Sequence, residues 1–327
     1  MFAYIIRRMM YMVVTLIIVS ILGFLLISLP PGTYLDVKIA ELRSKGSNTA
    51  VAQIDTLKER YHLNDPLYEQ YWRWISGFIR GDFGRSFMYN KPVSELIGDR
   101  ILNTIFISFG TLLFTWVVAL PIGIYSATHK YSFGDNFFTV VGFLGLSIPN
   151  FMLALVFMVL GATLFNNPVG GLFSAAYREA PWSFAKFVDL LKHIWIPIIV
   201  VGTAGTASLI RMMRSNLLDI LNQQYIQTAR AKGLSEGIVI YKHAVRNAIH
   251  PLIMYLGMSL PRIISGSTVV ALVLSLPTTG PLYFKALRNQ DMFLAGTFLI
   301  FMSVMLIVGN LLADILLAWV DPRIKYS

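Results

Sequence analysis

The most specific pattern of polar residues in this sequence lies between two apolar stretches, at residues 225–251. Its centre holds small, polar and basic residues: Gln227, Thr228, Ala229, Arg230, Ala231, Lys232, Gly233 and Leu234. Alanine favours a helix, and Gly233 stands where helices commonly end in a left-handed residue. Ser235 then occupies the cap position of a second helix, with Glu236 in its first turn. The pattern predicts a short helix, a glycine corner and a second helix.

Two kinds of partner fit such a corner equally well on physical grounds. Small side chains at Thr228, Ala229 and Ala231 let another protein surface approach closely. A basic amphipathic segment can instead rest on anionic lipid. Both interpretations stay open at this point.

The sequence lacks the motifs of common catalytic and cofactor sites. It contains no G-x-x-x-x-G-K-[ST] phosphate loop, no H-E-x-x-H metal motif and no G-x-S-x-G nucleophile elbow. Five scattered histidines without any cysteine form no metal constellation, and the lack of cysteine excludes disulfides and thiol catalysis. We therefore expect a chain that is not an enzyme, binds no metal and carries no cofactor of its own.

The composition indicates a membrane protein. Of 327 residues, 56% are hydrophobic and only 13% are charged, with a mean hydropathy of +0.63. Soluble domains carry about 25% charged residues, so too few polar side chains are present to cover a water-facing surface. A soluble enzyme, a disordered chain and a nucleic-acid binder are all disfavoured, although the net charge is +10.

Six apolar stretches are long enough to cross a bilayer, which requires about 20 residues each. They predict an all-α, polytopic membrane protein with spans at residues 9–29, 101–127, 137–165, 194–210, 249–276 and 293–320. The first stretch resembles a signal peptide but lacks a small-residue cleavage site, so we expect a retained anchor. An interfacial helix is expected from Pro181 onward.

Basic residues set the expected orientation. With the N-terminus in the cytoplasm, the inner segments hold eleven basic and four acidic residues, which satisfies the positive-inside rule. Residues 1–29 then form a cytoplasmic N-terminus and the first span, residues 30–100 an extracytoplasmic cap, and residues 101–320 a five-helix transmembrane core. The core contains a cytoplasmic loop at 211–250, and residues 321–327 form a cytoplasmic tail.

The motifs in these segments resemble those of a known family. Residues 228–235 and 243–248 look like the cytoplasmic coupling loop of ABC importer permeases, in the dipeptide/oligopeptide/nickel branch. In the wider family this loop reads Glu-Ala-Ala, three residues, then Gly, which maps here onto Gln227, Thr228, Ala229 and Gly233, without the acidic residue. Residues 63–68, 80–86 and 320–324 also match the branch.

The resemblance implies a type I ABC importer-like fold in a bacterial or archaeal plasma membrane, with both termini cytoplasmic. It implies a homologous second permease subunit, two cytoplasmic ATPase subunits docked on residues 227–234, and an extracytoplasmic solute-binding protein. ATP and magnesium would bind the ATPase subunits, and no nucleic acid is involved. Departures from the branch pattern at residues 30–36 and 277–280, and at Ala271, leave oligopeptides and oligosaccharides both open as solutes.

A few polar residues lie within or at the ends of the predicted spans. Arg262 is costly in lipid, so it is expected either on the solute path or, slightly favoured, paired at a subunit interface. Asn103 and Thr104 are expected to cap the second span.

Two other functions are weighed against an importer permease. A secondary transporter or channel would need charged or unwound half-helices at mid-membrane, and few candidates exist. A structural membrane subunit would leave the corner unexplained.

Overall fold

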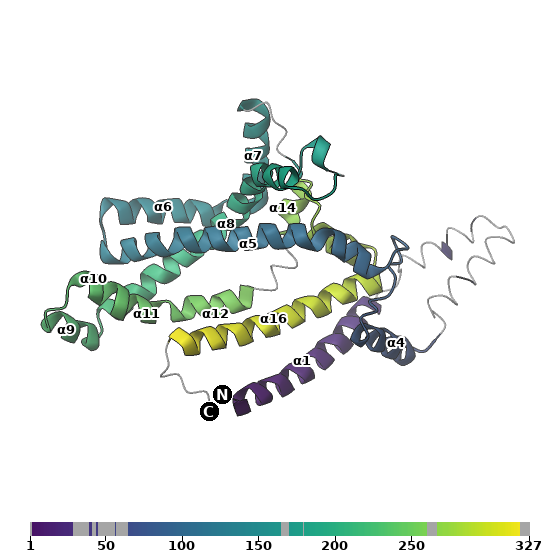
Figure 1. Cartoon of the computed structure of the whole chain (residues 1–327), viewed down its shortest axis with the longest axis horizontal. Coiled ribbons are helices and arrows are strands. Elements are labelled where there is room, and N and C mark those ends of the chain that lie inside the picture. Colours follow the sequence, from purple (N-terminus) through teal and green to yellow (C-terminus); the bar gives the residue numbers. More distant parts are fainter. Residues whose placement is uncertain are drawn as a thin grey trace. The chain divides into compact units, whose positions relative to one another are not determined.

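The computed structural model describes residues 2–28, 39–40, 44, 56, 65–164, 170–178, 180–259 and 267–320. Within these residues the chain is helical and has no strand, which confirms the all-α class for the described part of the chain. The longer helices are α1 (Phe2–Ser28), α4 (Leu67–Ile79), α5 (Val93–Thr128), α6 (Phe133–Ser147), α7 (Asn150–Leu164), α8 (Phe184–Leu221) and α16 (Met292–Val320) (Figure 1). The shorter ones are η1 (Ala175–Tyr177), α9 (Gln224–Ala231), α10 (Glu236–Ile238), the π-helix η2 (Val239–Ala244), α11 (Val245–Ala248), α12 (His250–Ser259), α14 (Thr268–Val273) and α15 (Thr279–Arg288).

Four described helices are long and apolar enough to cross a membrane: Met10–Ser28, Val93–Thr128, Phe184–Leu221 and Met292–Leu316. They confirm helices at the first, second, fourth and sixth predicted spans. Helix α5 starts eight residues before the predicted boundary. Its first two turns carry Glu95 and Asp99, and these charges lower the local hydropathy, so the hydropathy pattern did not include them in the span. Helix α8 absorbs both the interfacial helix expected from Pro181 and the first eleven residues of the predicted loop.

The third predicted span, residues 137–165, is not one straight helix. Helices α6 and α7 meet at a bend of 97°, so together they make a broken span or a re-entrant segment. Pro149 explains the break, since it lacks the N–H that would continue α6 and forces the preceding residue out of the helical region. Ile148 is accordingly extended, with φ −86° and ψ 118°. The third predicted span is therefore a bent pair of helices, which makes one span only if α6 and α7 are counted together.

The fifth predicted span, residues 249–276, is described only as α12 and α14. Residues 260–266 lie outside the described residues, and Arg262 is among them. The expected capping role of Asn103 was wrong, because α5 already begins at Val93. Its side-chain amide instead donates a hydrogen bond to the Pro277 carbonyl at 3.1 Å and ties α5 to the segment after α14.

The chain divides into two compact units, of which the first comprises Met1–Leu102 and Thr279–Met305. Its core joins α1, α4 and the start of α16 through Phe24, Trp74 and Ile300. Tyr71 packs edge-on against Phe24 with ring centroids 5.4 Å apart, and its hydroxyl lies 2.8 Å from that of Ser20. Aromatic packing therefore holds the amphipathic helix α4 against two predicted membrane helices.

A buried carboxylate links two distant chain segments of the first unit. Asp291 is fully buried and precedes α16 directly, where it accepts a hydrogen bond from the Leu294 N–H at 3.3 Å. It also accepts hydrogen bonds from the Ser86 hydroxyl and, at 3.1 Å, from the Met88 N–H. Desolvation raises the pKa of Asp291, an effect that these donors oppose. The segment before α5 is thus fastened to the start of α16.

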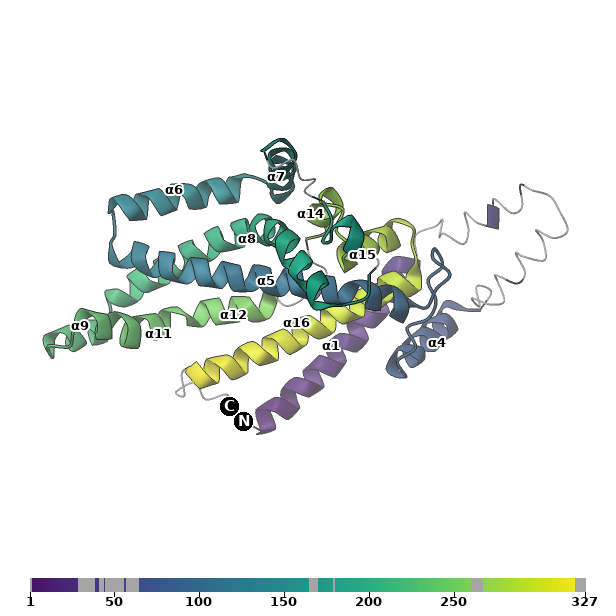
Figure 2. The ribbon, with the colours of Figure 1, turned by 45° about the horizontal axis from the view of Figure 1, so that its top comes forward.

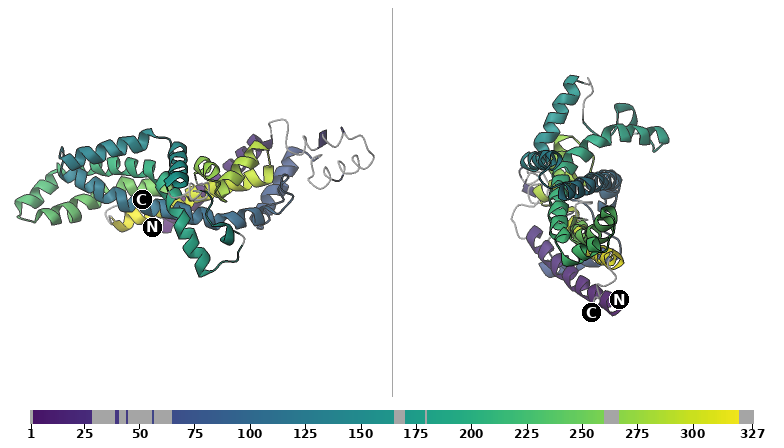
Figure 3. Two further views of the ribbon diagram at one scale, coloured as in Figure 1. Left: turned by 90° about the horizontal axis from the view of Figure 1, so that it is seen from above. Right: turned by 90° about the vertical axis from the view of Figure 1, so that its left-hand side faces the viewer.

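The second unit comprises Asn103–Thr278 and Leu306–Ser327. Helix α6 lies along α8 in every view (Figure 1, Figure 2 and Figure 3). A bidentate ion pair joins them, with Arg214 Nε and Nη2 at 2.7 and 2.8 Å from the carboxylate oxygens of Asp135, a residue only 1% exposed. Helix α12 approaches the second half of α16 closely at Gly257.

This approach predicts the effect of a single methyl group. A Cβ at position 257 would lie 2.6 Å from the Gly309 carbonyl oxygen and 2.7 Å from the Ala313 Cβ. Gly257→Ala should therefore separate the helices and destabilise the protein by about 1–3 kcal/mol, as overpacking does. The unfolding midpoint of the purified protein in detergent should fall by several degrees. Gly142→Ala is the control, because its Cβ would meet only the Ala207 Cβ at 3.9 Å. Equal midpoints for the two variants would contradict the packing.

Candidate functional site

Helix α9 ends at the predicted glycine corner, which we define as residues 227–236 (Figure 1). Gly233 has φ +77°, which confirms the predicted left-handed end. The Gly233 N–H donates to the Arg230 carbonyl at 2.9 Å, and the Leu234 N–H donates to the Ala229 carbonyl at 3.4 Å. These paired bonds satisfy carbonyls that a helix end would otherwise leave open. The sequence thus folds locally into a sharp, hydrogen-bonded turn.

An ion pair braces the corner from the outside. Arg230, at the end of α9, donates from Nη2 and Nε to Glu236 at 2.6 and 3.1 Å, across the glycine. These bonds lower the pKa of Glu236 and raise the pKa of Arg230. The expectation that Ser235 caps the second helix was wrong in part: it occupies the cap position, but its side chain makes no capping bond. The Arg230–Glu236 pair holds that turn instead.

The second helix is irregular. Helix α10 is only three residues long and passes into the π-helix η2 before α11. We call the stretch formed by α10, η2 and α11 the arm. One buried apolar cluster holds the arm against α8 and α9, and its members include Met213, Leu217, Ile226, Ala229, Val239, Ala244 and Ala248. The amide of Asn247 also donates to the Tyr225 hydroxyl at 2.8 Å. The corner therefore stands on a packed base.

The buried cluster changes the role expected for Ala229, which the sequence placed on the surface that a partner approaches. Ala229 is only 8% exposed and packs inside the chain, so it does not leave room for a partner as the sequence suggested. The physical reason is the helical period: Ile226 and Ala229, three residues apart, share the face of α9 that covers α8. Gln227, Thr228, Ala231, Lys232, Gly233 and Leu234 are exposed, and Arg230 is half-buried.

An apolar surface surrounds these exposed residues. Four large side chains near the corner lie open: Tyr225, Leu234, Ile238 and Tyr241, the last 66% exposed. Sequence reasoning missed Ile238 and Tyr241, because Val239 and Ile240 between them are also apolar and the sequence alone does not show which of these side chains is buried. Such a surface, rimmed by Lys232 and Lys242, suits binding to another macromolecule or to lipid.

Two features of the described residues bear on metal binding and on nucleophilic chemistry. None of their His, Asp and Glu side chains gather in groups of three that could hold a metal ion. Ser174, Asp189 and His193 lie together, but the Ser174 hydroxyl donates to Asp189 while the Nδ1 of His193 lies 2.8 Å from the Asp189 backbone carbonyl. A nucleophilic triad needs the serine bonded to histidine, so this cluster is an anchor for the segment before α8.

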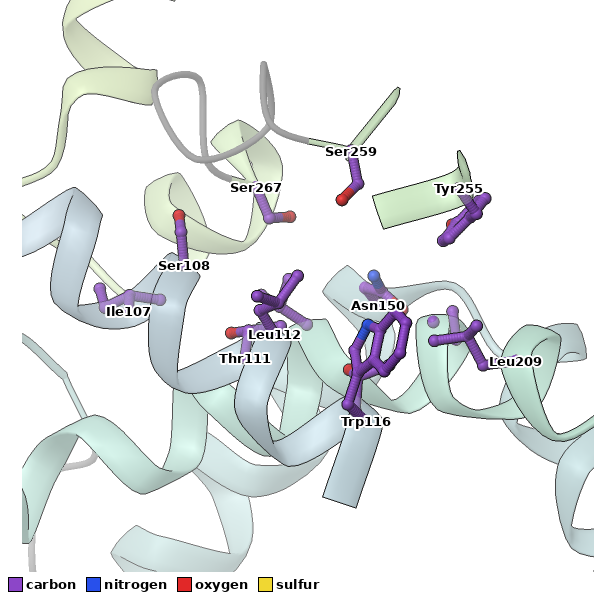
Figure 4. Close-up of a pocket in the computed structure, with 14 residues that line it drawn as sticks. Ile107, Ser108, Thr111, Leu112, Trp116, Asn150, Leu209, Tyr255, Ser259 and Ser267 are labelled. Carbon is purple, nitrogen blue, oxygen red and sulfur yellow. The ribbon is translucent and has the colours of Figure 1, made fainter. Parts of the chain in front are cut away.

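A second candidate site is a pocket of about 460 Å³ in the second unit, which we call the core pocket. Helices α5 and α8 form most of its wall, α12 contributes Tyr255 and Ser259, and Asn150 enters from the start of α7 (Figure 4). No described lining residue carries a charge. Arg262, the predicted pathway or interface residue, lies outside the described residues and is placed in neither site.

Comparisons with known proteins cover the whole chain. Residues 119–326 match the family described as binding-protein-dependent transport system inner membrane component, and residues 1–108 match its N-terminal counterpart. Over 99% of both chains, the sequence is 38% identical to the oligopeptide transport system permease protein AppB of Bacillus subtilis (strain 168). It is 30% identical to the dipeptide permease protein DppB of Alkalihalophilus pseudofirmus over the whole of both chains. The glutathione permease protein GsiC of Escherichia coli (strain K12) is 29% identical over 99% of both chains.

The fold has a neighbour among solved structures. The inward-facing MetNI methionine ABC transporter matches with a TM-score of 0.52 and 15% identity, over 69% of this chain and 96% of that one. At this identity the likeness supports the fold alone.

The brace across the corner predicts a pH dependence. A lowered pKa means that ionised Glu236 stabilises the corner above the ordinary value of 4.5, and this stabilisation is lost as the pH falls through the lower folded-state pKa. A spin label on Ser235→Cys, in a chain without other cysteines, should be equally restricted at pH 7 and 5 and more mobile below pH 4.5. Glu236→Gln should free the label at pH 7, whereas Glu95→Gln, on α5, should not. Unchanged mobility in Glu236→Gln would refute the brace.

Proposed function

Because the chain belongs to the family of binding-protein-dependent transport system inner membrane components, we propose that it is a permease subunit of an ABC importer for peptides. The relatives named above are permeases for oligopeptides, dipeptides and glutathione, and this supports a peptide over an oligosaccharide as solute. ATP hydrolysis is left to partner ATPase subunits, which hold ATP and magnesium. The observation that carries the proposal is the braced glycine corner with an exposed apolar surface, on the loop that matches the family.

We propose that the two ATPase subunits dock on the corner of this permease and of a homologous second permease. Exposed Leu234 and Ile238 supply apolar contacts, and Gln227, Thr228, Ala231, Lys232 and Gly233 form the rest of the surface. Gly233 and the Arg230–Glu236 pair fix its shape. A fixed surface favours docking because little conformational freedom is lost on binding.

A helical arm links the corner to the pocket. From Glu236 the chain runs through η2 and α11 into α12, whose Tyr255 and Ser259 line the core pocket. Movement of the docked ATPases would therefore reach the pocket through a packed arm. ATP can drive this change only by binding one state of the transporter more tightly than the other.

The membrane arrangement completes the proposal. We infer six spans, counting the α6–α7 pair and the α12–α14 region as one each, with both termini in the cytoplasm of a bacterium or archaeon. Residues 30–100 would form the extracytoplasmic cap, residues 101–320 the permease core and residues 321–327 the cytoplasmic tail. A solute-binding protein would deliver the peptide to the outer side. Arg262 keeps both of its proposed places, on the path or at the interface with the second permease.

The docking surface makes a direct prediction. Leu234→Glu puts a charge at the centre of the apolar surface and should weaken retention of the ATPase subunits about tenfold, which corresponds to about 1.4 kcal/mol. Gly233→Val should act similarly, because a β-branched residue in the left-handed region costs on the order of 1–2 kcal/mol. Lys242→Gln, at the rim, should behave like wild type. The measurements are co-purification of the ATPases and solute-stimulated ATP hydrolysis. Wild-type coupling in both Leu234→Glu and Gly233→Val would overturn docking and leave lipid as the partner of the corner.

The orientation can be tested separately. Ser235→Cys in this cysteine-free chain should react only with reagents that reach the cytoplasm. Ser44→Cys, in the proposed cap, should react with a membrane-impermeant thiol reagent added outside intact cells. The opposite labelling pattern would invert the topology while leaving the family unaffected.

A further inference from the structure

Helix α4 carries an exposed apolar surface in addition to the face that packs against the protein. Three of its large side chains lie open: Tyr68 is 71% exposed, Trp72 70% and Ile79 80%. Since successive residues of a helix are separated by about 100°, these three positions fall within about 40° of one another. They form one surface along the helix, which we call the α4 stripe.

The other side chains of α4 divide into a packed face and a polar face. The packed face contacts α1 and α16 through Tyr71, Trp74 and Phe78. The polar face lies on the far side of the helix axis and consists of Glu69, Arg73 and Ser76. By the helical period the α4 stripe lies between these two faces. A helix with this order of faces suits a boundary between an apolar medium and water.

The contacts of α4 with α1 fix its depth. Tyr71 contacts Ser20 and Phe24 of α1. These two residues lie eight and four positions before Ser28, where the span ends. At 1.5 Å per residue the span Met10–Ser28 is about 28 Å long, close to the hydrocarbon thickness of about 30 Å, so its end marks the membrane boundary. Helix α4 therefore contacts α1 about 6–12 Å below that boundary, a depth similar to the 5–10 Å typical of interfacial helices.

The second half of α4 contacts α16 near the start of that helix. Phe78 packs against Phe301 with ring centroids 5.7 Å apart. Trp74 lies against Gly296, where a Cβ would be only 2.8 Å from the indole ring. Both contacts fall in the first three turns of the span Met292–Leu316. Helix α4 thus bridges the end of α1 and the start of α16, and it is held there tightly (Figure 1).

We propose that the α4 stripe binds lipid at the boundary between the bilayer and water. Tyrosine and tryptophan favour this region, because each combines an apolar ring with one polar atom. At the same level α1 exposes Ile21, Leu22 and Leu26, all apolar, as a span in contact with lipid does. A solute-binding protein docks from the water phase, above the level at which α4 lies. Helix α4 is then the part of the proposed cap that lies in the membrane surface and fixes the depth of α1 and α16.

The test measures the surroundings of single spin labels on α4 in the assembled transporter. The transporter is built with cysteine-free partner subunits and reconstituted in vesicles of phosphatidylcholine and phosphatidylglycerol. This chain has no cysteine, so Trp72→Cys and Ile79→Cys each supply one labelling site. Oxygen concentrates in lipid, whereas a nickel chelate stays in water. The ratio of oxygen to nickel collisions should be several times higher at these two positions than at a position on the polar face.

Arg73→Cys is the matched control. Arg73 follows Trp72 directly but lies on the polar face, and its side chain is 56% exposed. A ratio at positions 72 and 79 as low as at position 73 would place the α4 stripe in water and overturn the proposal. Labels that neither reagent reaches would show that protein covers the stripe, which would also overturn it. Shielding of the labels from the nickel chelate only after the solute-binding protein is added would make that protein the partner instead. None of these outcomes bears on the proposed peptide importer.

A second measurement keeps the tryptophan itself. Trp72→Phe retains an aromatic ring, so the difference in tryptophan emission between wild type and this variant reports the emission of Trp72. In vesicles whose lipids carry bromine near the top of the acyl chains, this difference should lose most of its intensity. Iodide, which stays in water, should change it little. Quenching by iodide and not by brominated lipid would contradict binding of the stripe to lipid.

Discussion

A peptide group inside a bilayer has no water to bond with, so each of its N–H and C=O groups must find a partner within the protein. This constraint explains why the described chain is helical almost throughout. It also limits where the helices can be interrupted. Pro149 breaks the α6–α7 segment, and Asn150, directly after the break, contributes a polar side chain to the core pocket. The irregular π-helix η2 belongs to the polar segment between α8 and α12.

Backbone hydrogen bonding and apolar packing also determine the structure of the polar segment after α8. At Gly233 the chain turns so that the N–H groups of Gly233 and Leu234 bond to the last carbonyls of α9. The side chains of α9 lie on two faces, one buried and one exposed. Ile226 and Ala229 join the buried cluster, while Gln227 and Thr228 point outward. The segment between α8 and α12, residues 222–249, is tied to α8 by apolar packing and braced by an ion pair. It therefore continues into α12 as a packed arm rather than as a separate loop.

The sequence predicted the helices and the corner more reliably than it predicted contacts. Hydropathy located the first, second, fourth and sixth spans, because apolar length is a property of the chain itself. It could not detect the polar turns at the start of α5, nor the bend that one proline makes in an otherwise apolar run. Gly233 was predictable because only backbone geometry was needed. Ala229 was not, since the face of α9 that is buried depends on where α8 lies.

The fastening of Ser86 to Asp291 has a consequence for how the protein is made. These residues lie 205 positions apart in the chain, so the earlier one leaves the ribosome long before its acceptor exists. At about 5–20 residues per second the interval is roughly 10–40 seconds. During that time the segment before α5 has neither its buried carboxylate nor the helix that follows it. The first unit can therefore close only after Thr279–Met305 has been synthesised, by which time all of Asn103–Thr278, the larger part of the second unit, has already been made.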